Sequence, residues 1–415
     1  MTKALIIGGG IAGPVAALAL RRAGIESVVY EAYEGDAVGV GAFLTLSVNG
    51  LDALRAVGLD ELVADLGHPT PRMAMFNHKG RRLGEFGTSG TRTRGRGSTT
   101  VKRSDLYRVL RGEAVRQGVP IVHGARLVAA EPSGAGVRAR FADGRSAEGD
   151  LLVGADGLRS RTRQIIDPAA PAPRYVPLLN AGGFTHGLGL PGERGVMNMI
   201  FGRRCFFCWI PVGDDEVWWF ANPPQPAELT PAQLAAIGPD EWRARLRELF
   251  TGDAGPALRI IEATDRIQYG WPTYDLPSVP TWHRDRMIVI GDAAHTAAPS
   301  SGQGAAMAFE DAVVLAQCLR DLPDVPAAFA AYERLRRDRV ERVVAQGRRT
   351  SGTKVAGPVA RVLRDLALPI FAKRMAKDDG ASLAWLYDHH VEWGAPVAAG
   401  VTAPRAPGRT RPAPR

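Results

Sequence analysis

The chain has 415 residues, enough for two or three domains, and 45% of them are hydrophobic, as is typical of a globular protein with a large core. No apolar run approaches the roughly 18 residues of a membrane-spanning helix, no signal peptide precedes the first strand pattern, and three cysteines cannot build a disulfide framework, so we expect a cytoplasmic protein without a membrane span. The net charge of +9 comes partly from arginines of a loop at residues 92–96 and of a Pro/Ala/Gly-rich tail at 403–415, and because few aromatic residues interleave them we expect no nucleic-acid binding and a disordered tail.

The N-terminal residues predict a strand–helix–strand unit that binds a dinucleotide. An apolar strand pattern over residues 3–8 leads into a helix pattern, and a second strand pattern ends at Glu31. Gly8, Gly10 and Gly13 fit the GxGxxG spacing, in which the first glycine allows a tight turn, the second lets a pyrophosphate approach and the third lets the helix pack against the strand. The carboxylate of Glu31 can then accept hydrogen bonds from a ribose.

The next part of the chain adds two candidate contacts. Gly39 and Gly41 form a second pair of glycines, at which a ligand can approach the backbone closely. After a helix pattern over residues 47–58 and two strand patterns comes another helix, which we expect Ser104 to cap. Arg103 precedes that helix, so it either reaches a ligand or is a solvated surface arginine.

The middle of the chain predicts mainly strands. Residues 151–157 form a buried strand pattern that ends in Asp156 and the glycine after it. Residues 174–222 alternate in the manner of strands and predict a separate, mainly antiparallel sheet rich in aromatic side chains. Two helix patterns, Pro231–Ala236 and Pro239–Phe250, follow.

A second ligand-binding stretch follows these helices. The apolar run 287–290 predicts a short buried strand, and Asp292 lies where that strand ends. Unpaired amides at a helix start favour negative charge, and glycines let a flat ring approach the backbone. The loop and the start of the long helix after it supply both features, at Pro299, Gly302 and Gly304.

Neither a metal site nor a catalytic base stands out in the sequence. Cys205 and Cys208 have the CxxC spacing, but they lie inside a strand pattern without a second pair or a histidine cluster nearby, so we expect no metal or redox role. His186, His283 and His295 are each possible bases, and we assign the role to none of them. His295 follows Asp292 closely, and we expect it to order that loop.

Together the strand-end motifs resemble the class A FAD-dependent monooxygenases, the aromatic hydroxylase family typified by p-hydroxybenzoate and salicylate hydroxylases. The motifs that carry the resemblance are GGGIAG at Gly8–Gly13, ADG at Ala155–Gly157, GDAAH at Gly291–His295 and PSSGQG at Pro299–Gly304. The resemblance covers roughly residues 3–350. It implies an α/β fold, with a Rossmann-type (GR2-like) FAD-binding domain, an inserted antiparallel-sheet substrate domain and C-terminal helices.

The resemblance also implies a division of the chain and a set of site residues. The expected segments are 1–173 and 276–350 for the FAD-binding domain, 174–275 for the substrate sheet, 351–402 for C-terminal helices and 403–415 for the tail. The residues expected at FAD are Gly8, Gly10, Ala12, Gly13, Glu31, Gly41, Arg103, Asp156, Gly291, Asp292, Pro299, Gly302 and Gly304. The residues expected to line the substrate pocket are Met199, Phe201, Cys208 and Trp219, although strand alternation can turn half of them away.

The implied reaction uses FAD, NADPH or NADH as reductant, and O2. A flavin C4a-hydroperoxide would pass one oxygen atom to an aromatic or other electron-rich small molecule, and the apolar, aromatic sheet favours a bulky, uncharged, natural-product-like substrate. An epoxidase, a related FAD-dependent halogenase or reductase, and a non-catalytic FAD-binding protein remain alternatives. Ile210 and Pro211 match the end of the halogenase motif WxWxIP, but Phe206 and Cys208 replace its two tryptophans. We expect a monomer or homodimer.

Overall fold

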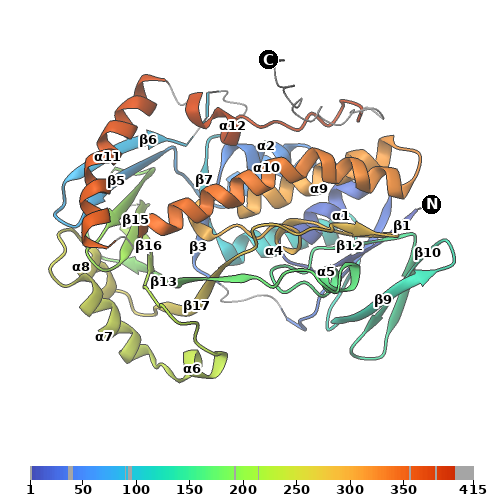
Figure 1. Ribbon diagram of the computed structural model, residues 1–415, viewed down its shortest axis with the longest axis horizontal. Helices are drawn as coiled ribbons and strands as arrows, with labels where there is room; N and C mark the ends of the chain where they lie inside the picture. The colour runs from blue at the N-terminus through green and yellow to red at the C-terminus, as the bar shows by residue number, and fades with distance from the viewer. Residues whose placement is uncertain are drawn as a thin grey trace, which may run out of the picture.

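Figure 1 shows the computed structural model, which describes residues 2–35, 41–88, 90–91, 96–190, 193–213, 215–354, 357–378 and 381–397. Two large β-sheets lie towards opposite ends of an elongated molecule. Two long helices, α9 (Gly304–Asp321) and α10 (Val325–Lys354), cross the region between them. Gly39, the loop residues 92–94 and the tail 403–415 lie outside the described residues.

A six-stranded, mainly parallel sheet carries all the predicted dinucleotide-site motifs. Its order is β18-β19-β12-β1-β2-β8, and every neighbouring pair is parallel except β18 with β19 at one edge. The strands are β1 (Lys3–Ile7), β2 (Glu26–Tyr30), β8 (Ile121–Val122), β12 (Leu151–Gly154), β18 (His283–Arg284) and β19 (Met287–Val289). Continuous apolar runs make β12 and β19 wholly buried, as a parallel sheet covered on both faces requires. The predicted Rossmann-type α/β fold is confirmed.

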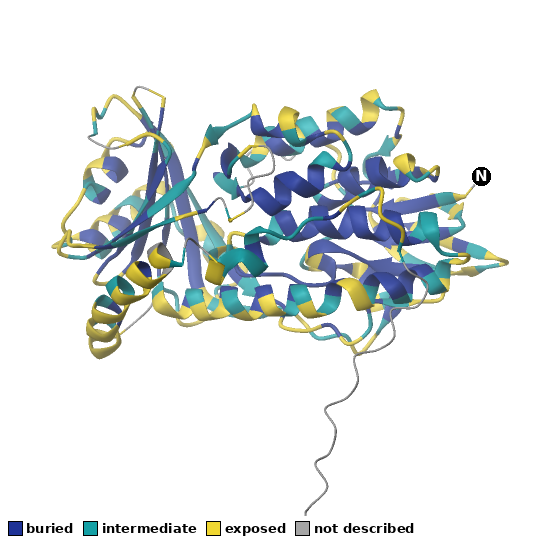
Figure 2. Ribbon diagram, turned by 90° about the horizontal axis from the view of Figure 1, so that it is seen from above, coloured by how far each residue is buried: buried dark blue, intermediate teal, exposed yellow. Residues whose placement is uncertain are grey.

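Two largely buried helices, α1 (Ala12–Arg22) and α9, form the centre of this half. Every residue of α1 from Ala12 to Leu20 is buried, and so is every residue of α9 from Ala306 to Cys318. Figure 2 shows this central pair of helices largely in the colour of buried residues. Such helices are apolar on most sides because they are enclosed on most sides.

The other elements of this half surround the sheet and the two central helices. They are α2 (Val48–Arg55), α3 (Asp60–Ala64), α4 (Arg103–Arg116), α5 (Arg161–Ile166), the sheet of β3 (Phe43–Leu46), β4 (His68–Pro69) and β7 (Thr99–Lys102), and the sheet of β9 (Leu127–Ser133), β10 (Gly136–Phe141) and β11 (Ser146–Gly149). The expected cap at Ser104 is wrong. Lys102 is the N-cap residue of α4 without a side-chain cap, so Arg103 is the first residue of the helix.

The second sheet has seven strands in the order β17-β13-β16-β15-β14-β5-β6. They are β5 (Arg72–Asn77), β6 (Arg82–Gly87), β13 (Arg174–His186), β14 (Val196–Phe201), β15 (Phe206–Val212), β16 (Glu216–Asn222) and β17 (Gln268–Asp275). All neighbours are antiparallel except β14 with β5. Strands β5 and β6 come from the segment that the sequence analysis assigned to the FAD-binding domain, because an alternating pattern does not say which sheet a strand joins.

Helices cover both sides of this sheet. Helices α7 (Pro239–Phe250) and α8 (Ala257–Glu262) pack against one face, and α6 (Pro231–Ala236) precedes them. Towards the C-terminus, α10 ends beside β15 and β16, and α11 (Pro358–Lys377) packs on β6. Helix α12 (Ala384–Tyr387) follows. Within the described ranges, none of the helices has the length and apolar character needed to cross a bilayer.

Candidate active site

The carboxyl ends of three neighbouring strands bring the predicted motifs together. β1 pairs in parallel with β12, and β12 pairs in parallel with β19, so the loops after them leave the same edge of the sheet. A Cβ placed on Gly8 would lie 2.4 Å from the carbonyl oxygen of Ala155, so the first two loops touch directly. In open α/β sheets, ligands bind outside the carboxyl ends of the strands, which makes this edge the candidate cofactor site.

The three glycine positions of the GxGxxG motif need glycine for different physical reasons. Gly8 has φ of +107° and abuts the next loop, and a Cβ on Gly13 would lie 1.9 Å from the carbonyl oxygen of Gly8. Gly10 has neither a positive φ nor a close backbone neighbour. A Cβ added to it would lie 3.5 Å from its nearest atom, Cε1 of Tyr107, which is an ordinary contact. The packing of the protein itself explains Gly8 and Gly13 but not Gly10, as expected where a ligand lies against the backbone.

Glu31 is fixed in place by the glycine turn and by an arginine. Its Oε2 accepts from the amide of Gly9 at 2.8 Å and from Nη2 of Arg111 at 3.3 Å, and its Oε1 accepts from the amide of Tyr33 at 3.0 Å. Nε of Arg111 also donates to the carbonyl oxygen of Gly9 at 2.5 Å. The sequence analysis missed Arg111, because a single arginine on a helix gives no local signal of what it contacts.

Arg103 faces the candidate site and is not a solvated surface arginine. Its Nη2 donates to the hydroxyl of Tyr107 at 3.2 Å, and a Cβ on Gly41 would lie 3.2 Å from its Cδ. Its Nε is buried and has no hydrogen-bond partner among the residues that the structure describes. A buried donor of a cationic group without an acceptor is costly. Its position therefore fits a group with anionic or carbonyl oxygens, such as FAD.

Asp156 caps α5. Its Oδ2 accepts from the amide of Thr162 at 2.9 Å and from the hydroxyl of Thr162 at 3.0 Å, and its Oδ1 accepts from the hydroxyl of Ser160 at 2.5 Å. A carboxylate at a helix N-terminus satisfies unpaired amides and interacts favourably with the helix dipole. The structure therefore gives Asp156 a role in shaping its loop, and direct contact with FAD stays a prediction.

The loop after β19 presents Asp292 at the same edge. Gly291, with φ of +56°, lets the loop pass between α1 and α9, because an added Cβ would lie 3.3 Å from the Cβ atoms of Ala12 and Ala308. Asp292 is exposed to solvent, yet enough protein surrounds its carboxyl group for lost hydration to raise its pKa, against the opposing effects of His295 and Arg103. A carboxyl group in this setting gains from hydroxyl donors, which the ribityl chain of FAD carries.

The N-terminus of α9 is open to a ligand. Gln303, its N-cap residue, makes no side-chain cap, so no side chain of the cap satisfies the first amides of this helix. Cβ atoms added to Gly302, with φ of +62°, or to Gly304 would meet nothing within 4 Å. Open space beside uncapped amides is what an anionic ligand edge needs. The residues of this loop therefore fit the flavin of FAD, and Pro299 is exposed beside them.

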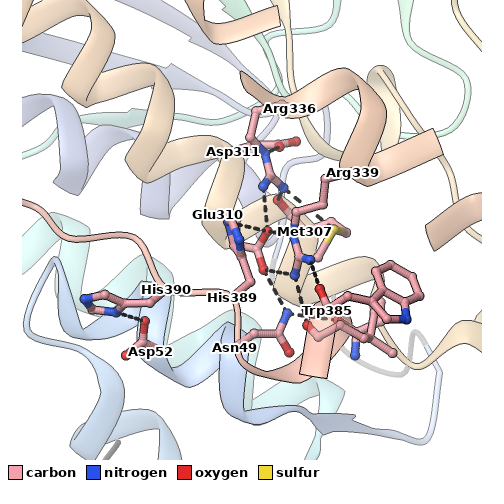
Figure 3. Close-up of polar contacts among 12 residues, drawn as sticks. Asn49, Asp52, Met307, Glu310, Asp311, Arg336, Arg339, Trp385, His389 and His390 are labelled. Carbon is pink, nitrogen blue, oxygen red and sulfur yellow. Dashed lines mark hydrogen bonds and ion pairs between the residues drawn. The ribbon is translucent and has the colours of Figure 1, made fainter. Parts of the chain in front are cut away.

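His295 is held by a buried acid and is not placed as a catalytic base. Its Nε2 bonds Oδ2 of Asp311, and this same oxygen accepts from the amide of Gly291 at 2.9 Å. Nε of Arg336 bonds the other oxygen of Asp311 at 2.7 Å, a contact visible in Figure 3. The histidine therefore ties the loop after β19 to α9 and α10, in agreement with the expectation that it orders the loop.

A second buried acid extends this network to the loop beside the flavin site. Glu310 bonds Arg336, Arg339 and the amide nitrogen of Asn49, as Figure 3 shows. Asn49 also donates to Oε1 of Gln303, the residue before α9 begins, at 3.0 Å. Burial alone would raise the pKa of Glu310, but Arg336 and Arg339 outweigh it and lower the pKa to about 2. The site loop thus rests on a fixed charge network.

The predicted substrate residues divide between the two faces of the seven-stranded sheet. Met199 pairs directly with Cys208, and both belong with Phe201 to an apolar cluster on the face beside β3 and α11. Trp219 lies on the opposite face, where its ring stacks on Phe207 with centroids 5.3 Å apart and its Nε1 donates to Thr264. The expectation that Trp219 lines the same surface is therefore corrected, because successive strand residues alternate between faces.

Phe220 takes the position that the sequence analysis gave to Trp219. It pairs with Cys208 across the strands, and its ring centroid lies 5.7 Å from that of Phe43 in β3. Burial raises the pKa of the Cys205 and Cys208 thiols well above the usual range, so neither is a reactive thiolate. Among the residues that the structure describes, no cluster of His, Cys, Asp and Glu has the arrangement of a metal site.

The loop arginines were expected to bind no nucleic acid. Arg96, the described member of that loop, forms ion pairs with Glu61 and Asp65 at 2.8 and 2.7 Å. It is thus engaged with the protein's own acids, and the absence of nucleic-acid binding stays a prediction.

Comparison with known proteins gives one family. The family model described as "FAD binding domain" matches residues 1–347. The chain is 33% identical to an aurachin C monooxygenase/isomerase of Stigmatella aurantiaca over 82% of this chain and 86% of that protein. It is also 33% identical to an FAD-dependent urate hydroxylase of Klebsiella pneumoniae over 84% of this chain and 89% of that protein.

Comparison with solved structures finds the same fold. The structure of Klebsiella pneumoniae HpxO complexed with FAD and uric acid has a TM-score of 0.81 and 28% identity, and covers 93% of this chain and 97% of that one. A substrate complex of salicylate hydroxylase has a TM-score of 0.76 at 22% identity over 98% of this chain and 99% of that one, which supports the fold.

Proposed function

The chain belongs to the class A FAD-dependent monooxygenases, and from this premise we propose that it hydroxylates an aromatic ring of a largely apolar small molecule, with NADPH or NADH as reductant. The observation that carries the proposal is the uncapped start of α9 with open space beside Gly302 and Gly304. When bound and reduced, FAD would activate O2, one oxygen atom of which would enter the substrate while the other leaves as water.

The residues of the chain have separable tasks in this proposal. The turn at Gly8–Gly10 and the carboxylate of Glu31 bind the pyrophosphate and the adenosine ribose. Arg103 and the amides at the start of α9 are donors that are already oriented, so they would hold the flavin end of FAD and favour negative charge on it. Asp292 accepts hydrogen bonds from the ribityl chain.

The seven-stranded sheet provides the substrate surface. Met199, Cys208 and Phe220 form a row across three neighbouring strands on the face beside β3. Such a row orients a flat apolar ring and keeps water from the oxygen that is transferred. We also propose a cytoplasmic monomer or homodimer that binds no nucleic acid and has no membrane span.

The test follows FAD, reductant and oxygen together. Purified protein should be yellow, release FAD on denaturation, and consume NAD(P)H and O2 when an aromatic substrate is added. Following peroxide in the same assay separates a hydroxylated substrate, which gives little peroxide, from an effector, which gives one peroxide per NAD(P)H. A colourless protein, or turnover that requires halide, would contradict the proposal.

A further inference from the structure

Helix α11 presents a stripe of apolar side chains to solvent. Its members are separated by three or four residues, so they lie on one side of the helix. Each of them is at least 60% exposed, and they are Val359, Val362, Leu363, Leu366 and Ile370. Single exposed apolar residues are ordinary on a protein surface, but a contiguous stripe of them marks a surface that binds a partner.

The opposite side of α11 already has its partner within the chain. Leu368 packs against the apolar cluster on the sheet face beside this helix. Ala372 is buried against β6, where a Cβ added to Gly84 would collide with it. Arg364 is also buried, and its guanidinium lies 4.7 Å from the ring centroid of Phe201. Figure 1 shows α11 at one end of the molecule, with its outer side turned away from the sheet. The stripe is therefore a second apolar face, which the fold leaves open.

The C-terminal end of this stripe is basic. The exposed basic residues there are Lys373, Arg374 and Lys377. They follow Ile370 by three, four and seven residues, so they continue the same side of the helix. The one acid in α11, Asp365, bonds Arg364 at 2.9 Å and Asn77 at 3.0 Å, on the inner side. Asp378 follows the last turn as the C-cap residue. The stripe itself thus carries positive charge only.

The charge of α11 disfavours a second copy of this helix as the partner. In an antiparallel pair, the basic end of each helix would lie beside the N-terminus of the other. That N-terminus has no side-chain cap and no acid in its first turn, so its partial positive charge is not offset. A parallel pair would bring the two basic ends together. An anionic lipid surface matches both features, because its headgroups attract the basic residues and its acyl boundary accepts the apolar ones.

We propose that the outer face of α11 docks on an anionic membrane surface. The helix lies along the surface, with the apolar stripe at the boundary between headgroups and acyl chains and the basic end at the lipid phosphates. Its inner face packs on β6, so docking holds the seven-stranded sheet next to the lipid. This inference goes beyond the proposed function and is independent of it, because docking needs neither reductant nor substrate.

The experiment measures binding of the FAD-loaded protein to lipid vesicles by flotation. One set of vesicles is phosphatidylcholine alone, and the other contains phosphatidylglycerol as the anionic lipid. An apolar double variant, Leu366→Gln with Ile370→Gln, removes part of the stripe. A charge double variant, Lys373→Gln with Lys377→Gln, removes part of the basic end. All four side chains are exposed, so the fold should not depend on them.

Two substitutions on α10 are the matched controls. Leu335→Gln changes an exposed leucine, and Arg334→Gln changes the exposed arginine before it. Circular dichroism and FAD content show that each variant is folded. Light scattering without vesicles gives the oligomeric state of the wild type and of the apolar double variant.

The wild type should bind the phosphatidylglycerol vesicles about ten-fold or more tightly than phosphatidylcholine alone, and added salt should weaken this binding. Each double variant should lose about ten-fold or more in affinity for the anionic vesicles, while both controls match the wild type. Absence of binding to the anionic vesicles, or unchanged binding in either double variant, would overturn the inference. So would a wild-type dimer that the apolar double variant separates, since a second copy would then cover the stripe. NAD(P)H-dependent O2 uptake, measured without vesicles, reports separately on the proposed function.

Discussion

Oε2 of Glu31 accepts a hydrogen bond from the amide of Gly9 at 2.8 Å, so the acid at the end of β2 is joined to the glycine turn at the end of β1. The acid that is predicted to bind the ribose is therefore also part of the turn that is predicted to bind the pyrophosphate. Arg111 bonds both partners, which fixes their relative position. A change at Glu31 should thus loosen the glycine turn and weaken cofactor binding together.

The first prediction is that Glu31→Gln weakens FAD binding about ten-fold or more. The amide keeps an acceptor for Gly9 but loses the charge, and a hydrogen bond to a charged group contributes roughly 1.5–3 kcal/mol. FAD affinity is measured by fluorescence titration of the apoprotein, with Glu26→Gln, at an exposed residue of the same strand, as control. Wild-type affinity in Glu31→Gln would remove this residue from the site.

The second prediction concerns the buried network behind the flavin loop. Arg336 bonds both Glu310 and Asp311, and all three side chains are almost completely buried. Arg336→Met leaves two carboxylates without this partner, and breaking a buried pair from one side costs about 3–5 kcal/mol. Urea unfolding should show a loss of this size. In Arg116→Met, which breaks an exposed pair, the loss should be small. Equal effects of the two substitutions would show that the network does not stabilise the fold.

The third prediction is a loss of stability in acid that depends on Glu310. Its pKa is lowered in the folded protein from 4.5 to about 2, so the folded state favours the ionised form. The stability that the ionised Glu310 contributes is therefore complete above pH 4.5 and is lost as the pH falls from there towards 2. Unfolding free energies measured across this range should fall more steeply for the wild type than for Glu310→Gln. Parallel pH curves for the two proteins would contradict it.

The sequence was sufficient for the motifs that are local and insufficient for the contacts that are not. Gly8, Asp292 and Gly304 could be placed at strand ends and a helix start because apolar runs and glycines mark these points along the chain. Strands β5 and β6 could not be assigned to their sheet, since alternation sets a strand's faces and not its partner. Trp219 was assigned to the wrong face because alternation along a strand does not say which of its two faces lines the pocket.

Two charged residues escaped prediction for a different reason. Arg111 and Asp311 each lie on a helix whose pattern gives no sign of a special role. Their importance comes from neighbours elsewhere in the chain, Glu31 for Arg111 and Gly291 for Asp311. Only the tertiary structure shows that Arg111 bonds the acid at the end of β2 and that Asp311 supports the loop after β19.

The central claim is that the open space at the start of α9 holds the flavin. Gly304→Val tests it directly, because the added side chain meets no atom of the protein within 4 Å of its Cβ and so should not strain the fold. Gly112→Val, at an exposed helical glycine that also has nothing within 4 Å, is the matched control for the effect of valine on a helix.

The measurement is FAD occupancy together with the rate of flavin reduction by NAD(P)H in a stopped-flow experiment, with circular dichroism to confirm folding. We predict that Gly304→Val binds FAD more weakly and is reduced about 10²–10³ times more slowly, as expected when a preorganised donor is displaced, while Gly112→Val matches the wild type. Full FAD occupancy with wild-type reduction kinetics in Gly304→Val would contradict the placement of the flavin at this helix.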